Sequence, residues 1–332
     1  MAFGTPVFDI LGIGNAIVDV LAPVVAGFPE TQGMVPASMS LIDASRADEI
    51  ESLITPVQHT GGGSAANTCV VAAALGARIA YLGKVAQDPA GAHFRRDIEA
   101  AGIVFPSSPL ADAATTGQAT ARCIILVTPD GQRTMNTYLG ACTSFDEADV
   151  LAQTVQSARI TYLEGYLFDP PAAQQAFRRA SALAHEAGRL VALSLSDPFC
   201  VGRHRAAFRE LVADDIDILF ANEEEVLSLY ETDDFELAAQ RAGTDVDLAV
   251  LTRSAKGSLI VSNGTQTVVA AEPVHVVDTT GAGDAYAAGF LAGLIRDLPL
   301  AECGRIGAVA AAEIISHFGA RPVADLRRLA GI

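Results

Sequence analysis

Short apolar runs rich in β-branched residues alternate along this chain with longer alanine-rich segments of helical period. Parallel strands are buried on both faces and appear as continuous apolar runs, whereas the crossover helices between them repeat near 3.6 residues. The alternation therefore predicts an α/β fold with a mostly parallel central sheet and helices on both of its faces. The expected core strands are residues 7–14, 79–85, 160–164, 190–195, 217–221 and 248–252. The clearest expected helices are residues 171–186, 281–296 and 300–317.

Two regions interrupt this rhythm. Residues 22–41 are punctuated by Pro and Gly, and residues 116–139 contain two strand-like runs on either side of the turn Thr-Pro-Asp-Gly. Such runs could pair into a small sheet that is discontinuous in sequence and acts as a lid. The predicted division is a large α/β domain of residues 1–14, 61–112 and 143–332 and a small lid region of residues 15–60 and 113–142.

The charge balance excludes two classes of partner. The chain has 39 Asp and Glu against 22 Lys and Arg, a formal net charge of −17. Nucleic acid and anionic membranes both require clustered basic residues, so neither is expected to bind. A phosphorylated ligand would have to be held locally, by a metal ion and backbone amides.

The cysteines and the start of the chain bear on location. None of the five cysteines has C-x-x-C spacing, and the first residues carry no basic segment of the kind that begins a signal peptide. A cytoplasmic protein with buried, reduced cysteines is expected, as a monomer or a homodimer. These cysteines are Cys69, Cys123, Cys142, Cys200 and Cys303.

The strongest local motif is the segment 278–290, Asp-Thr-Thr-Gly-Ala-Gly-Asp followed by an apolar helix. Unpaired N–H groups at a helix start, together with the helix dipole, can hold developing phosphoryl charge without a basic side chain. Asp284 could accept the proton of a hydroxyl that attacks a γ-phosphate. The alternative is an Asp that merely complements the dipole, and for an isolated motif that alternative is the better interpretation.

Two further turns lead out of strands. Residues 61–67 read Gly-Gly-Gly-Ser-Ala-Ala-Asn, where glycines let a ligand approach the backbone and Asn67 offers both a donor and an acceptor; the alternative is a simple N-cap by Ser64. Residues 12–19 superficially match a dinucleotide fingerprint, but Ile17 occupies the position of the third glycine. Asn15 and Asp19 suit hydrogen bonds to a vicinal diol instead.

A fourth motif, Asn222-Glu223-Glu224-Glu225, follows the expected strand 217–221. An Asn and a carboxylate at a strand end could order water around Mg²⁺. An N-cap followed by glutamates that favour the helix dipole is the alternative, and on chemistry alone it is the better one.

Together these four blocks, in this order, resemble the two signatures and the intervening N-x-x-E motif of the ribokinase-like PfkB kinases. The resemblance spans the whole chain and implies a ribokinase-like fold with a small β-sheet lid and MgATP as phosphoryl donor, with a monovalent cation such as K⁺ possible. It implies Asp284 as catalytic base and an anion hole of Gly281, Ala282 and Gly283. It also implies action of Asn222 and Glu225 on Mg²⁺ and phosphate through water, and sugar contacts by Asn15, Asp19, Gly63 and Asn67.

Within that family, segments 193–199 and 217–223 look most like adenosine kinases. This resemblance implies that Arg133 reaches the transferred phosphate, although a solvated hairpin charge is an alternative. Apolar and aromatic residues would enclose the base, although an ordinary domain interface needs such residues too. The candidates for that pocket are Met135, Leu139, Phe168 and Phe199.

The ATP side is expected to include Asn222, Thr252, Gly257, Gly281 and Gly283, with Ser254 at a position where many sugar kinases have glycine. Glu164, at the end of a core strand, has no clear counterpart in adenosine kinases and is expected to bind a purine N–H or a sugar hydroxyl.

The predicted activity is ATP-dependent phosphorylation of a nucleoside 5′-hydroxyl, with adenosine as the leading substrate. The alternatives are inosine or guanosine, or a sugar kinase acting on ribose, fructose or 2-keto-3-deoxygluconate. A non-catalytic nucleoside-binding module is less expected, since both the base and the anion cradle are present. Nicotinamide chemistry is disfavoured by Ile17.

Overall fold

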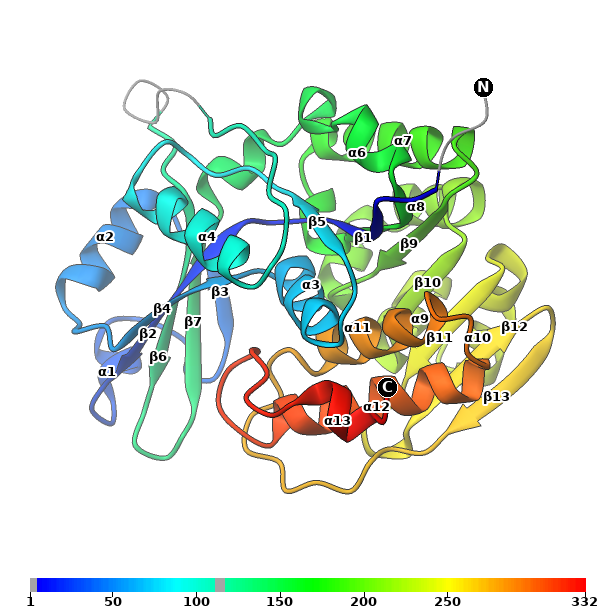
Figure 1. Ribbon diagram of the computed structural model, residues 1–332. Helices are drawn as coiled ribbons and strands as arrows, with labels where there is room; N and C mark the ends of the chain where they lie inside the picture. The colour runs from blue at the N-terminus through cyan, green and yellow to red at the C-terminus, as the bar shows by residue number, and fades with distance from the viewer. Residues whose placement is uncertain (1–4, 111–116) are drawn as a thin grey trace.

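The computed structural model describes residues 5–110 and 117–332. Its larger sheet has eight strands in the order β13-β12-β11-β10-β9-β8-β1-β5 (Figure 1). Neighbours from β5 to β11 pair in parallel, whereas β12 and β13 add an antiparallel hairpin at one edge. The strands are β1 (Phe8–Ile13), β5 (Ile79–Leu82), β8 (Ala158–Glu164), β9 (Leu190–Ser194), β10 (Ile218–Asn222), β11 (Leu248–Thr252), β12 (Ser258–Ser262) and β13 (Thr265–Val269).

The prediction of a mostly parallel sheet from six apolar runs is confirmed. The hairpin of β12 and β13 is additional, and β13 is hard to detect because most of its side chains are exposed.

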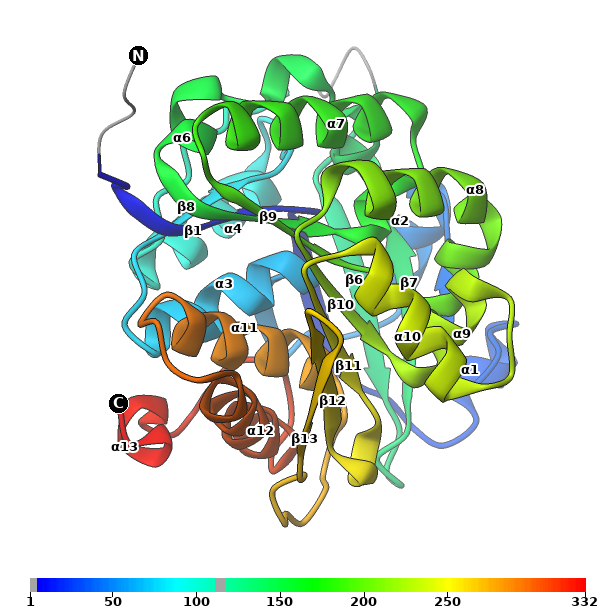
Figure 2. The ribbon, with the colours of Figure 1, turned by 90° about the vertical axis from the view of Figure 1, so that its right-hand side faces the viewer.

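Helices cover both faces of this sheet, as Figure 2 shows. Side chains that alternate along a strand point to opposite faces, so Ile218 and Phe220 of β10 join one core while Leu219 and Ala221 join the other. One face carries α3 (Ser64–Ala74), α11 (Ala282–Leu294) and α12 (Leu300–Ile315), and the other carries α7 (Pro171–Glu186), α8 (Pro198–Asp215), α9 (Glu223–Tyr230) and α10 (Phe235–Asp245). The three helices expected with most certainty are confirmed, to within two residues at each end.

A second, smaller sheet lies beside the first, in the order β3-β7-β6-β2-β4 (Figure 1). The expected hairpin is confirmed, because β6 and β7 pair antiparallel across the turn that contains Gly131. Ile124 and Leu126 of one sheet face pack against Ala47 and Ile50 of the outer helix α2 (Ala44–Ser52). The strands are β2 (Ile17–Pro23), β3 (Met39–Leu41), β4 (Gln58–Gly62), β6 (Ala121–Val127) and β7 (Arg133–Tyr138).

Part of the predicted domain division lies outside the described residues, namely residues 1–4 and 111–116. No helix in the described part of the chain is long and apolar enough to cross a membrane. All five cysteines are free and buried, as expected.

Candidate active site

The carboxyl ends of the parallel strands meet at one edge of the large sheet, which is where ligands bind in open α/β folds. Asn15 follows β1, Glu164 ends β8, and Asn222 ends β10 beside Thr252 of β11. The first turns of α3 and α11 meet at Asp284, through the hydrogen bonds described next. Most of the polar residues singled out in the sequence therefore gather at this edge.

Asp284 occupies the first turn of α11 and is held by two side chains of α3. The Ser64 hydroxyl donates to Asp284 Oδ1 at 2.6 Å, and Asn67 Nδ2 donates to Oδ2 at 3.2 Å. Burial raises the pKa of Asp284 to about 6, against these two hydrogen bonds, which lower it. The group is thus ionised at neutral pH yet basic enough to accept a proton.

Ser64 was not among the predicted site residues, and its interpretation as an N-cap is wrong. The N-cap of α3 is Gly63, at φ 99°, and no side chain caps that position. The sequence shows a hydroxyl in the first turn of a helix, but it could not show that this turn faces Asp284, 220 residues away.

The start of α11 leaves backbone donors free. Gly281, at φ 78°, is its N-cap without a side-chain cap, and Ala282 N donates to Thr279 O at 3.2 Å. Within residues 5–110 and 117–332, no acceptor bonds the N–H of Gly283 or Asp284. A Cβ at Gly283 would meet open space, so an anion has room to approach this turn, where both N–H groups lack a partner.

Asp19 of β2 lies against the glycine turn that precedes α3. Burial raises its pKa to about 7, while the positive charges of Arg321 and Arg133 lower it. Arg321 also donates to Gly61 O and pairs with Asp97 at 3.2 Å. Arg321 was missed, because it lies beyond the last recognisable motif and nothing in its local sequence marks it.

Glu164 is placed differently from the prediction. Its side chain is buried, and its two oxygens accept hydrogen bonds from Asn15 and from the Ala65 backbone. Burial raises the pKa of Glu164 to about 7, although these hydrogen bonds lower it. The structure does not bring Glu164 to the surface of the site as predicted, because the residue is 1% exposed and both oxygens accept hydrogen bonds within the protein.

Arg133 of β7 links the small sheet to the turn before α11. Its guanidinium pairs with Asp278 at 2.8 Å and is 5.2 Å from the Phe318 ring centroid. With only 11% of its side chain exposed, Arg133 is not the solvated hairpin charge of the alternative interpretation. Met135 lies two residues along the same strand, hence on the same face, and is half-buried; Leu139 follows the strand and is also half-buried.

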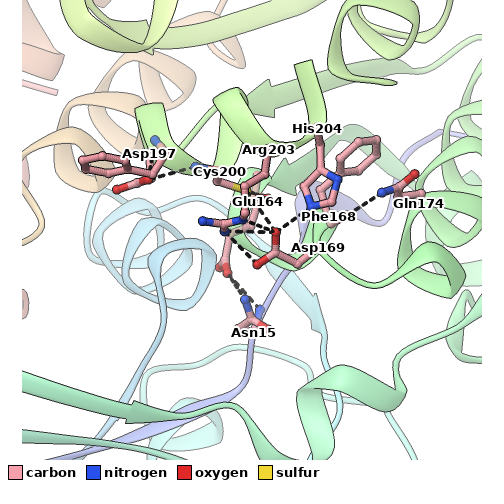
Figure 3. A network of polar contacts seen from close by, with 11 residues as sticks. Asn15, Glu164, Phe168, Asp169, Gln174, Asp197, Cys200, Arg203 and His204 are labelled. Carbon is pink, nitrogen blue, oxygen red and sulfur yellow. Dashed lines mark hydrogen bonds and ion pairs between the residues drawn. The ribbon is translucent and has the colours of Figure 1, made fainter. Parts of the chain in front are cut away.

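The two aromatic residues predicted to stack on a nucleobase lie in different environments. Phe168 is fully buried, with its ring centroid 4.4 Å from that of Phe208, so it belongs to the core and has no free face for a base. Figure 3 shows it beside His204. Phe199, by contrast, is 77% exposed at the start of α8.

Tyr166 is an aromatic residue beside this edge that was not among the predicted site residues. It lies in the short 3-10 helix η3 (Gly165–Phe168) and is 36% exposed. Burial of its hydroxyl, and then the charges of Asp197 and Asp284, raise its pKa. Those charges show that it lies near the acidic edge. It is the first aromatic residue after the carboxyl end of β8, a position that could have identified it.

Asn222 and Glu225 form a reciprocal cap at the start of α9. Asn222 Oδ1 accepts from Glu225 N at 2.9 Å, while Glu225 Oε2 accepts from Asn222 N at 2.9 Å. The alternative interpretation as an N-cap is thus present in the structure. Thr252 pairs with Asn222 in the sheet, and Gly257 (φ 84°) closes the next turn after Ser254, which has the left-handed φ of 49°.

The comparisons with known proteins agree with this arrangement. A model described as pfkB family carbohydrate kinase matches residues 35–326. The chain belongs to the PfkB family of carbohydrate kinases. It is therefore a phosphotransferase that acts on an alcohol group, and its fold is ribokinase-like.

Three similar proteins illustrate the range of this PfkB kinase's relatives. The structure of adenosine kinase from Sinorhizobium meliloti is 46% identical, with a TM-score of 0.89 and 98% of each chain covered. That of a probable sugar kinase from Rhizobium etli CFN 42 is 42% identical, with a TM-score of 0.90 and the same coverage. A nucleoside kinase of Methanothermobacter thermautotrophicus is 28% identical over 270 residues, covering 80% of this chain and 82% of the relative.

PfkB kinases generally use ATP and Mg²⁺. In the described segments of this kinase, no cluster of three or more metal-ligating side chains forms a protein cage. Mg²⁺ that is bound to nucleotide phosphates needs only one or two carboxylates and keeps several waters. The pKa of Glu225 is raised to about 7 by burial and by the negative charges of Asp197 and Asp284, against the hydrogen bond from Asn222 N, which lowers it. The negative charges around Glu225 fit a cation that binds through water, with Asn222 and Glu225 as its predicted contacts.

Proposed function

We propose that this PfkB kinase transfers the γ-phosphoryl group of ATP to the 5′-hydroxyl of a nucleoside, with adenosine as the preferred acceptor. The observation that carries the proposal is the pairing of Asp284 with two unbonded N–H groups at the start of α11. A base and an anion site are thereby joined in a single helical turn. The similarity to nucleoside and adenosine kinases supports the choice of acceptor.

The reaction is an in-line displacement. The 5′-oxygen forms a bond to the γ-phosphorus as the bond to the β,γ-bridging oxygen breaks, and ADP leaves. Asp284 accepts the hydroxyl proton, while the N–H groups of Gly283 and Asp284 stabilise charge on the transferred group. Mg²⁺ would supply further charge neutralisation, with Asn222 and Glu225 reaching it through water. Gly281 and Ala282 set the shape of the turn. They are not proposed as equal donors to the phosphate, because the N–H of Ala282 already donates to Thr279 O.

The small sheet is proposed to act as a lid over this centre. Arg133 is paired with Asp278 at 2.8 Å, next to the turn that leads into α11. A phosphate in that turn would compete with Asp278 for the guanidinium, because Arg binds phosphate oxygens through two parallel hydrogen bonds. Arg133 would then bind the transferred phosphate and hold the lid closed over it.

The acceptor pocket is proposed to have a polar part and an aromatic part. Ribose hydroxyls would meet Asn15, Asp19 and Asn67 beside Gly63, where backbone approach is close. The base would lie against Tyr166, Met135, Leu139 and Phe199. Phe168 is left out of this pocket, since its ring is in the core.

The test is ADP release with MgATP, comparing kcat/KM for adenosine, inosine, guanosine, ribose, fructose and 2-keto-3-deoxygluconate. We expect adenosine to exceed every other acceptor by roughly 10-fold or more, because a pocket built to bind one base leaves polar groups unpaired with another. A preference for inosine or guanosine would mean that the acceptor carries a different nucleobase from the one proposed. A preference for a free sugar would contradict the nucleoside assignment.

The second candidate is a sugar kinase using the same centre. It is favoured by the 42% identity to the probable sugar kinase from Rhizobium etli. The same panel of acceptors separates the two functions.

A further inference from the structure

The buried carboxylate of Glu164 lies behind the proposed ribose site and accepts three hydrogen bonds. Asn15 Nδ2 and Asn15 N donate to Oε1 at 2.7 and 3.2 Å, and Ala65 N donates to Oε2 at 2.7 Å. Figure 3 shows the Asn15 amide pointing at this carboxylate. Glu164 is 1% exposed, and none of the ion pairs in the described segments includes it. N–H groups alone therefore stabilise its charge.

These hydrogen bonds fix how Asn15 can meet a ligand. The Tyr81 hydroxyl donates to Asn15 O at 3.0 Å, so the backbone of Asn15 is held on both sides. One of its two Nδ2 hydrogens is donated to Glu164, whereas Oδ1 receives no hydrogen bond from any residue that the structure describes. The bond to Glu164 therefore fixes the orientation of the side-chain amide, leaving Oδ1 as an acceptor for a hydroxyl group and one Nδ2 hydrogen as a donor.

The other carboxylate oxygen, Oε2, binds to α3, the helix whose side chains hold the proposed catalytic base Asp284. Ala65 follows Ser64 in the first turn of α3, and Ser64 and Asn67 both bond Asp284. A carboxylate at a helix start satisfies a free N–H and complements the dipole. One side chain thus connects the ribose contact at Asn15 with the turn that orients Asp284.

The segment that carries Glu164 is itself held in place. Beyond η3, Asp169 pairs with Arg203 at 2.9 Å and with His204 at 2.8 Å, as Figure 3 shows. Cys200 Sγ lies 3.4 Å from Gly165 O. Gly14 completes the fit, because a Cβ there would overlap the Glu164 carboxylate.

We infer that Glu164 is a positioning residue that locks Asn15 as the hydrogen-bond acceptor for a ribose hydroxyl and joins that contact to the first turn of α3. This inference rests on the proposed function and adds to it the residue that sets the hydroxyl specificity. Glu164 acts through Asn15 and does not touch the substrate.

The experiment compares kcat/KM for adenosine, 2′-deoxyadenosine and 3′-deoxyadenosine. Glu164→Gln keeps the shape of the side chain. Its amide NH₂ group must, however, face at least one of the three N–H donors, and it cannot accept a hydrogen bond from that donor. The wild-type enzyme should prefer adenosine over at least one deoxy analogue by on the order of 10-fold. In Glu164→Gln that ratio should fall to within about threefold.

A double-mutant cycle tests whether Glu164 acts through Asn15. Asn15→Ala should lose the same discrimination, and adding Glu164→Gln to it should change the ratio no further. Glu164→Asp keeps the charge but is one methylene shorter, and it serves in place of the glutamine variant if that variant does not fold. The matched control is Asp217→Asn, whose carboxylate accepts from Val191 N at 2.7 Å at the opposite edge of the sheet. It should keep the wild-type ratio.

A folded Glu164→Gln enzyme that discriminates like the wild type would overturn the inference, as would a wild-type enzyme indifferent to both deoxy analogues. If the wild-type enzyme phosphorylates ribose and no nucleoside, the proposed acceptor is wrong. The same cycle measured with ribose and 2-deoxyribose then decides the role of Glu164 separately.

Discussion

Two helices begin at the same edge of the large sheet in opposite ways. At the start of α9, Asn222 and Glu225 satisfy each other's backbone N–H groups. At the start of α11, the N-cap is Gly281, and in the described part of the chain the next free donors, Gly283 N and Asp284 N, have no protein partner. A capped start is stable without a ligand, whereas an uncapped start has donors left for an anion.

The helix α3 falls between these two cases. Its first turn also follows a glycine, but Glu164 from a distant strand accepts from Ala65 N at 2.7 Å. A glycine-led turn of the same kind can therefore be structural or functional. The groups that the tertiary fold places beside its N–H groups decide which.

The largest expected effect comes from removing the carboxylate of the uncapped turn. Asp284→Asn should lower kcat by about 10³-fold, since general-base catalysis contributes on the order of 10²–10⁴. Calorimetric titration should show adenosine binding within a few-fold of the wild type. The control is Glu224→Gln, an exposed carboxylate in the first turn of the capped helix α9. It should leave kcat unchanged, and unimpaired turnover in Asp284→Asn would remove Asp284 as the base.

Substitution by alanine should have different effects at two glycines of the uncapped turn. A Cβ at Gly283 meets open space, so Gly283→Ala should keep or slightly raise the melting temperature while lowering kcat about 10-fold by crowding the N–H that meets phosphate. At Gly281, φ is 78° and a Cβ would lie 2.6 Å from that of Ala320. Gly281→Ala should therefore cost about 1–2 kcal/mol of stability. Thermal unfolding and ADP release measured together separate the two; full activity in Gly283→Ala would argue against an anion site there.

The pH dependence tests what α3 contributes to α11. Asp284 acts as a base only when ionised, and burial raises its pKa to about 6, so kcat/KM should fall about tenfold per unit as pH drops below that value. The Ser64 hydroxyl lowers this pKa, so Ser64→Ala should move the acid limb of the profile to higher pH. An acid limb that does not move in Ser64→Ala would mean that another group controls it.

The smallest effect is expected at the capped helix. Asn222→Ala removes one half of the cap and should lower the free energy of unfolding by about 1 kcal/mol, measured by urea denaturation. If Asn222 also orders water around Mg²⁺, the KM for MgATP should rise as well. Lower stability with an unaltered KM would leave Asn222 a cap and nothing more.

The sequence was informative wherever the signal was local. Six parallel strands, three helices and the hairpin of β6 and β7 follow from apolar runs, helical period and one Asp-Gly turn. It was less informative for β4 and β13, whose exposed or glycine-rich residues give no buried pattern. It also predicted Phe168 as a stacking residue, because no local pattern shows that the turn of η3 buries this ring in the core while Tyr166 stays partly exposed.

By itself the sequence determined the fold class and the order of the motifs, since periodicity and glycine-led turns are properties of short segments, and the resemblance of those motifs to the PfkB signatures indicated the kinase family. Only the tertiary structure decided which groups meet. Ser64 bonds Asp284 across 220 residues of sequence, and Glu164 holds Asn15 across 149. Arg133 of the small sheet pairs with Asp278 in the turn before α11. Contacts of this kind depend on how α3, α11 and β8 pack around one sheet edge, and no local pattern encodes that packing.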